Sequence, residues 1–129
     1  MSIFDQDWLM QANLRRHGAP PFGLVVVHGG PGACGDVTPV ARELAPLCGV
    51  LEPIQTANTL AGQVEELKHT VEHHAACPVV LVGHSWGAWL SYLVAARYPS
   101  LVCKLILVSA GPFDASYAPD IEKTRLIRL

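Results

Sequence analysis

Apolar and polar positions divide the chain into four short apolar runs separated by longer mixed segments. The runs are Leu24–Val27, Val50–Ile54, Val79–Val82 and Leu105–Val108. Apolar runs without strict alternation are typical of strands that are buried on both faces. Because segments of helical length lie between the runs, the pattern predicts βαβ units and therefore an α/β fold, with a mainly parallel sheet and flanking helices.

The mixed segments predict helices. The segment after the first run predicts a helix that Thr38 caps and that has Pro39 at its first position. The segment from about Trp86 to Tyr98 is apolar around most of its circumference and stops before Pro99, so it predicts a central, buried helix. Residues 5–17 predict a weak N-terminal helix.

The clearest helical pattern lies between the second and third runs. Four apolar residues recur there at i, i+4, i+7 and i+11, namely Leu60, Val64, Leu67 and Val71. Asn58 or Thr59 can cap this helix, and His73 and His74 can close it, where cationic side chains suit the helix dipole. A metal site is the alternative for these histidines, since His69 lies four residues before His73, but no third ligand follows nearby.

Length and composition narrow the class of protein. A chain of 129 residues, half of them hydrophobic, predicts one folded domain. The net charge of −2 offers no basic surface for nucleic acid, and no apolar stretch reaches the ~20 residues of a membrane helix. Residues 1–16 lack the apolar region of a secretory signal, and the four cysteines form no C-x-x-C pair. We expect a cytoplasmic protein without a metal, whose reduced cysteines fill small apolar positions.

The first candidate for chemistry is Gly83-His84-Ser85-Trp86-Gly87, which directly follows the third apolar run. We call residues 83–87 the nucleophile turn. A G-x-S-x-G between a strand and a helix holds the serine exposed on a strained turn, and Gly83 and Gly87 keep the neighbouring positions small. A helix beginning at Trp86 directs its positive end at the site. The motif predicts Ser85 as a nucleophile.

The second candidate is His28-Gly29-Gly30-Pro31-Gly32, which directly follows the first apolar run. We call residues 28–32 the oxyanion loop. A serine nucleophile needs N–H donors for the oxyanion, one from the residue after it and one from such a loop. We therefore expect donation from the backbone of Trp86 and of Gly30, because Pro31 has no N–H. The loop-shaping residues of the two motifs are then His28, Gly29, Pro31, Gly32, Gly83 and Gly87.

The sequence contains no histidine after Ser85, although the base of such a site usually comes later in the chain. His84 adjoins Ser85, but neighbouring side chains on a tight turn diverge, so we expect His84 to point away from the pocket. We expect His28 to shape the oxyanion loop rather than to titrate.

The two motifs together resemble those of the α/β-hydrolase family, in its proline iminopeptidase-like branch and related esterases. The resemblance covers about residues 22–129. It implies a serine hydrolase without a cofactor, acting on the carbonyl of a small ester or peptide, N-terminal proline peptides among them. Ser85 would be the nucleophile, with Gly30 and Trp86 as oxyanion donors.

The resemblance also implies an incomplete α/β-hydrolase fold. Residues 1–22 would be an N-terminal segment, residues 23–113 the N-terminal portion of the hydrolase core, and residues 114–129 the start of a truncated cap. The family's acid and histidine follow the cap, and Asp114 and Asp120 match neither. The branch often has glycine where His84 stands.

Two alternatives remain from the residues. Gly30–Gly35 also satisfies G-x-G-x-x-G, with Glu52 about 20 residues on, which is the pattern of a dinucleotide site. Pro31 removes a loop N–H, and the predicted helix starts only near Pro39. The other alternative is a non-catalytic half that pairs with another chain or with itself through an uncovered sheet edge and an apolar C-terminal segment.

Overall fold

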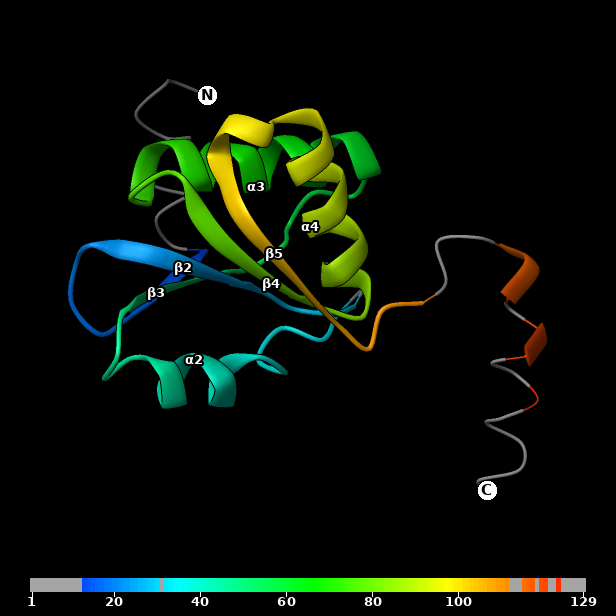
Figure 1. Ribbon diagram of the computed structural model, residues 1–129, viewed down its shortest axis with the longest axis horizontal. Coiled ribbons are helices and arrows are strands. Elements are labelled where there is room, and N and C mark those ends of the chain that lie inside the picture. The colour runs from blue at the N-terminus through cyan, green and yellow to red at the C-terminus, as the bar shows by residue number, and fades with distance from the viewer. Residues whose placement is uncertain (1–12, 31, 112–114, 118, 121–122, 124–129) are drawn as a thin grey trace.

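A computed structural model describes residues 13–30, 32–111, 115–117, 119–120 and 123. Within them, five strands form one sheet in the order β1-β3-β2-β4-β5 (Figure 1). They are β1 (Leu14–His17), β2 (Phe22–Val27), β3 (Gly49–Pro53), β4 (Val79–His84) and β5 (Val102–Val108). All neighbouring pairs are parallel except β1 with β3. The predicted α/β fold with a mainly parallel sheet is confirmed.

Helices cover both faces of this sheet (Figure 1). Helices α3 (Leu60–His74) and α4 (Trp86–Arg97) lie on one face, and α2 (Thr38–Leu44) lies on the other. Two short 3-10 helices follow, η1 (Pro99–Leu101) and η2 (Ala115–Tyr117). Among the described residues, none of the helices combines the length and the apolar composition that a membrane span requires.

Two hydrophobic cores lie on opposite faces of the sheet. Alternate residues of the inner strands belong to one core or the other, because successive side chains of a strand point to opposite faces. Val25 and Val27 join Leu81 in the core beneath α3 and α4, while Leu24 and Val26 join the core beneath α2. The strand β2 is therefore buried on both of its faces, as its continuous apolar run predicts.

The helix predicted for residues 5–17 is wrong over residues 14–17, and residues 5–12 lie outside the described part of the chain. Leu14–His17 instead forms β1, which pairs antiparallel with β3 from Leu14 opposite Pro53 to His17 opposite Val50. Leu14 is buried in the core beneath α3. Pairing with a central strand outweighs a weak helical pattern.

Of the two predicted helix caps, one is confirmed and one is wrong. Thr59 caps α3, where its side-chain oxygen accepts the Gly62 N–H at 3.0 Å. Thr38 does not cap α2, whose N-cap is Val37 without a side-chain hydrogen bond. The Thr38 hydroxyl instead donates to Glu52 Oε2 at 2.6 Å, because a buried carboxylate competes for it.

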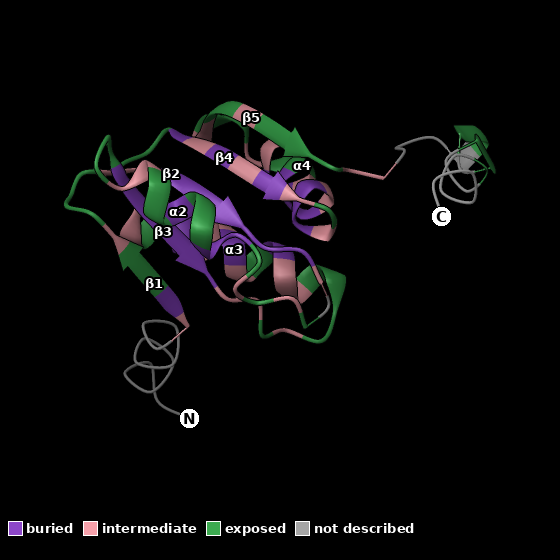
Figure 2. Ribbon diagram, turned by 90° about the horizontal axis from the view of Figure 1, so that it is seen from below, coloured by how far each residue is buried: buried purple, intermediate pink, exposed green. Residues whose placement is uncertain are grey.

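Burial departs from prediction at the β5 side of the molecule. Ile106, Leu107 and Val108 remain about 40% exposed, although their run predicts burial on both faces. The strand β5 lies at the edge of the sheet, and no other described strand pairs beyond it (Figure 2). Helix α4 is buried on one side only, and its Tyr92 is 45% exposed. The apolar pattern predicts surfaces that are suited to burial. On β5 and α4, no described residues cover part of these surfaces.

The side chain of Leu60, at the start of α3, is also exposed, whereas Val64, Leu67 and Val71 are buried as predicted. The four cysteines are free and all are exposed, so none of them contributes to the two cores.

Candidate active site

The nucleophile turn joins β4 to α4 at Ser85. The Ser85 backbone has φ 53° and ψ −116°, a conformation that L-residues rarely adopt. Its N–H donates to the Val108 carbonyl at 3.0 Å, which fixes the turn to the end of β5. A non-glycine residue in such a conformation costs of order 1–3 kcal/mol and persists only where its surroundings impose it.

The two glycines of the turn are required by close backbone approach. A Cβ on Gly83 would collide with the Gly87 carbonyl, and a Cβ on Gly87 would collide with the Val27 carbonyl at the end of β2. The first residues of α4 can therefore pack directly against the carboxyl ends of β2 and β4.

The oxyanion loop lies against this turn because β2 and β4 are neighbouring parallel strands, with Val27 opposite Gly83. A Cβ built on Gly29 would stand 3.3 Å from the Ser85 Cβ. Gly30 has φ +152° and Gly32 has φ +83°, conformations that favour glycine. Pro31 lies outside the described residues. The structure thus brings together the two motifs that stand far apart in the sequence.

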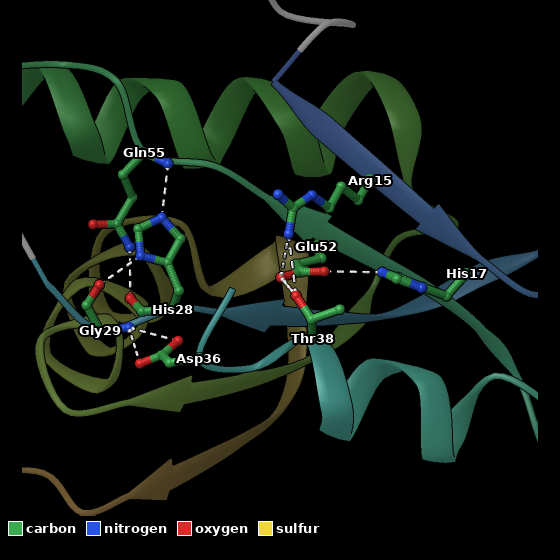
Figure 3. A network of polar contacts seen from close by, with 8 residues as sticks. All are labelled: Arg15, His17, His28, Gly29, Asp36, Thr38, Glu52 and Gln55. Carbon is green, nitrogen blue, oxygen red and sulfur yellow. Dashed lines mark hydrogen bonds and ion pairs between the residues drawn. The ribbon is translucent and has the colours of Figure 1, made fainter. Parts of the chain in front are cut away.

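His28 is buried, and both of its ring nitrogens are engaged (Figure 3). Its Nε2 accepts the Gln55 backbone N–H at 3.0 Å, and its Nδ1 contacts the Gly29 carbonyl. Accepting at Nε2 places the proton on Nδ1. The Gln55 side chain also donates to the His28 carbonyl at 2.7 Å, so the loop is held to the chain that follows β3.

Asp36 is a site residue that the motifs do not reveal. Its carboxylate accepts the Gly29 N–H at 3.1 Å (Figure 3) and contacts His84 Nδ1 at 2.8 Å. The His84 ring is therefore turned to Asp36. No sequence motif relates the position of Asp36 to the nucleophile turn. Only the fold shows that its carboxylate reaches both Gly29 and His84.

The side chain of Trp86 lies in a polar contact, in which its Nε1 donates to Gln63 Oε1 at 2.8 Å. Near it, a small cavity of about 10 Å³ is lined by side chains that include Gln55, Gln63 and Leu90. A cavity of this size holds about one water molecule, and Ser85 is not among its lining residues. It is too small to be a substrate pocket.

The geometry disfavours the dinucleotide alternative. Helix α2 begins at Thr38, three residues after Gly35, so the glycines do not open a helix. The Glu52 carboxylate is fully buried and contacts His17, Thr38 and Arg15, which leaves it unable to bind a ribose (Figure 3).

In the described part of the chain, the histidines at the end of α3 lie beside one another and beside Arg16. The rings of His69 and His73 lie 4.1 Å apart, and the His74 Nδ1 is 3.3 Å from an Arg16 nitrogen. Among the described residues, no three His, Cys, Asp or Glu side chains converge as metal ligands would.

Comparisons with known proteins point to one family. The model of the alpha/beta hydrolase fold family matches residues 52–128, more than half of the chain. Epoxide hydrolase 4 of Homo sapiens is 33% identical over 46 residues, and that of Mus musculus is 30% identical over the same length. These alignments cover 36% of this chain and 13% of each relative.

Solved structures share the fold. A thioesterase domain from the curacin biosynthetic pathway superimposes with a TM-score of 0.68 at 24% identity, covering 85% of this chain and 46% of that one. An epoxide hydrolase from Bacillus megaterium gives a TM-score of 0.68 at 20% identity, covering 84% and 42%. The chain thus spans less than half the length of these structures and a smaller part of the curated relatives. The chain belongs to the α/β-hydrolase fold family.

Proposed function

We propose that this chain is the nucleophile-bearing portion of a serine hydrolase. In this proposal the Ser85 Oγ attacks a carbonyl carbon, and the N–H groups of Gly30 and Trp86 stabilise the oxyanion that forms. The C–O or C–N bond then breaks, the leaving alcohol or amine takes a proton, and water releases the acid from the acyl-serine. The observation that carries the proposal is the strained conformation of Ser85 beside the glycine-rich oxyanion loop.

Part of the catalytic apparatus would come from outside these 129 residues. His28 has both nitrogens engaged, His84 faces Asp36, and no histidine follows Ser85 in the sequence. We therefore propose that the base and its acid belong to polypeptide beyond this sequence. The second candidate, a non-catalytic half that requires a partner chain, is favoured by the exposed apolar residues of β5.

The proposed substrate is a small ester or peptide. The two motifs resemble those of the proline iminopeptidase-like branch, which makes peptides with N-terminal proline one candidate. Two curated relatives are named epoxide hydrolases, but the chemistry of a serine disfavours an epoxide here. A serine that opened an epoxide would remain as an ether, which water does not readily cleave, whereas an acyl-serine is hydrolysed. We expect the protein to act in the cytoplasm without a cofactor.

The test is intact-mass analysis of the 129-residue chain after treatment with a fluorophosphonate, with Ser85→Ala as the control. We expect one adduct that forms slowly and is absent from the variant. Loss of a triad member can cost ~10⁶-fold in kcat, so Ser85 without its base should react slowly. An adduct that persists in Ser85→Ala would contradict the proposal, and a folded chain without an adduct at pH 7 and at pH 9 would favour the second candidate, a non-catalytic half, over the hydrolase.

Size-exclusion chromatography of the same sample addresses the second candidate. A chain that elutes as a folded monomer contradicts the need for a partner, whereas a dimer or larger species supports pairing through an exposed edge.

A further inference from the structure

We infer that Asp36 is a positioning residue that fixes the oxyanion loop against the nucleophile turn. The inference rests on the proposed function and extends it to a residue outside both motifs. A single carboxylate oxygen, Oδ2, lies 3.1 Å from the Gly29 nitrogen and 2.8 Å from His84 Nδ1. Gly29 directly precedes the proposed donor Gly30, and His84 directly precedes Ser85.

The contacts of Asp36 are well suited to a link between the two segments. A carboxylate only accepts hydrogen bonds, so His84 is the donor and carries its proton on Nδ1. Asp36 is itself held in a turn, where its N–H donates to the Ala33 carbonyl at 3.1 Å. A Cβ on Gly29 would lie 2.9 Å from Asp36 Oδ2, so the link needs glycine at that position.

The oxyanion loop has particular need of such a link. Three of its residues are glycines, and a glycine-rich segment loses much conformational entropy when it is held in one geometry. The Gly29 N–H is committed to Asp36 and cannot donate to a substrate, which leaves the next N–H, that of Gly30, for the oxyanion. Loss of the carboxylate would free the loop relative to Ser85 while leaving the sheet intact.

The experiment compares Asp36→Ala with Asp36→Asn and with a control carboxylate. Glu72→Ala is the control, because Glu72 pairs with Lys68 on α3, at 3.3 Å, away from the loop. We measure the rate of fluorophosphonate labelling at Ser85 and the rate of amide hydrogen exchange at Gly29. Only variants whose circular dichroism spectra match that of the wild type, and which are therefore folded, are compared. We expect labelling of Asp36→Ala to slow by ~10–100-fold, since misplacement by 1 Å can cost about 10²-fold.

The asparagine variant separates positioning from charge. Its side-chain oxygen can take the place of Oδ2 and accept from both the Gly29 N–H and the His84 Nδ1–H, as in the wild type. We expect Asp36→Asn to label within about threefold of wild type and to keep the Gly29 amide protected, whereas Asp36→Ala exposes that amide. Equal labelling and equal exchange in Asp36→Ala and wild type would overturn the inference.

Failure of the proposed function is distinguishable from failure of this inference. A wild-type chain without an adduct contradicts the function, and the Gly29 exchange rates then decide whether Asp36 holds the loop. A labelled wild type with an unaffected Asp36→Ala contradicts only the inference. If Asp36→Ala does not fold, His84→Ala tests the other half of the link: we expect slower labelling with Gly29 still protected, and an unchanged rate overturns the inference.

Discussion

Two carboxylates, Glu52 and Asp36, each link segments that are distant in the sequence. Glu52 lies within β3, is fully buried, and holds β1 and α2 to the sheet through Arg15, His17 and Thr38 (Figure 3). Asp36 lies in the loop before α2, with a side chain 24% exposed, and contacts Gly29 and His84. A buried carboxylate with partners thus supports the fold, whereas the partly exposed Asp36 can set the geometry of the loop at little cost in stability.

The largest effect is expected from Glu52→Ala. The change removes the acceptor of the Thr38 hydroxyl and of His17 Nε2, which lie at 2.6 and 2.9 Å. Breaking one side of a buried, paired charge typically costs ~3–5 kcal/mol, because the other side is left without a partner. We expect a loss of about 3 kcal/mol in the free energy of unfolding, measured by urea denaturation. A loss below about 1 kcal/mol would mean that Glu52 contributes no more to stability than an exposed carboxylate does.

A smaller loss is expected from Asp36→Ala in the same denaturation experiment. Its contact with His84 is partly exposed, with the two side chains 24% and 38% accessible, so water can replace it. A typical hydrogen bond contributes ~0.5–1.5 kcal/mol net, and contacts that water reaches contribute at the lower end. We expect a loss of about 1 kcal/mol or less, together with the slower labelling described above. A loss equal to that of Glu52→Ala would remove the distinction between the two carboxylates.

A gain in stability is expected from Ser85→Gly. Glycine adopts the φ of 53° without the steric cost that serine bears, although it adds entropy to the unfolded chain. We expect a net gain of up to about 1 kcal/mol with complete loss of labelling. Ser85→Ala is the matched control, since alanine keeps the strain and removes the hydroxyl. If both variants unfold at the same urea concentration, the turn stores no strain.

Much of the fold could be predicted because the determinants are local. The four apolar runs mark β2, β3, β4 and β5, and the capping of α3 by Thr59 depends on a residue only three positions away. The strand β1 escaped prediction because Leu14–His17 is mostly polar, and β3, far along the chain, is what makes it a strand.

Of the site, the motifs predicted which residues would meet but not what holds them together. The nucleophile turn and the oxyanion loop adjoin because β2 pairs with β4, and the apolar runs predict parallel strands but not this strand order. The contact of Asp36 with His84 spans 48 positions, and Thr38 with Glu52 spans 14. The contact of Asp36 depends on the path of the loop before α2, and that of Thr38 depends on which acceptor its hydroxyl reaches. The spacing of apolar residues predicts neither.

The smallest effect is expected from Ser91→Ala, which removes a buried polar group that has no partner among the described residues. Ser91 lies in α4 and is fully buried like Glu52, yet its hydroxyl has no hydrogen-bond partner among the described residues. Removing a buried polar group without a partner relieves a desolvation cost, whereas removing one with partners creates such a cost. We expect Ser91→Ala to leave the free energy of unfolding unchanged or to raise it by up to about 1 kcal/mol. Ser91→Val, which puts one methyl group in place of the hydroxyl and adds a second, tests whether packing limits the gain. A loss above about 1 kcal/mol in Ser91→Ala would mean that the hydroxyl has a partner, and burial alone would then no longer separate it from Glu52.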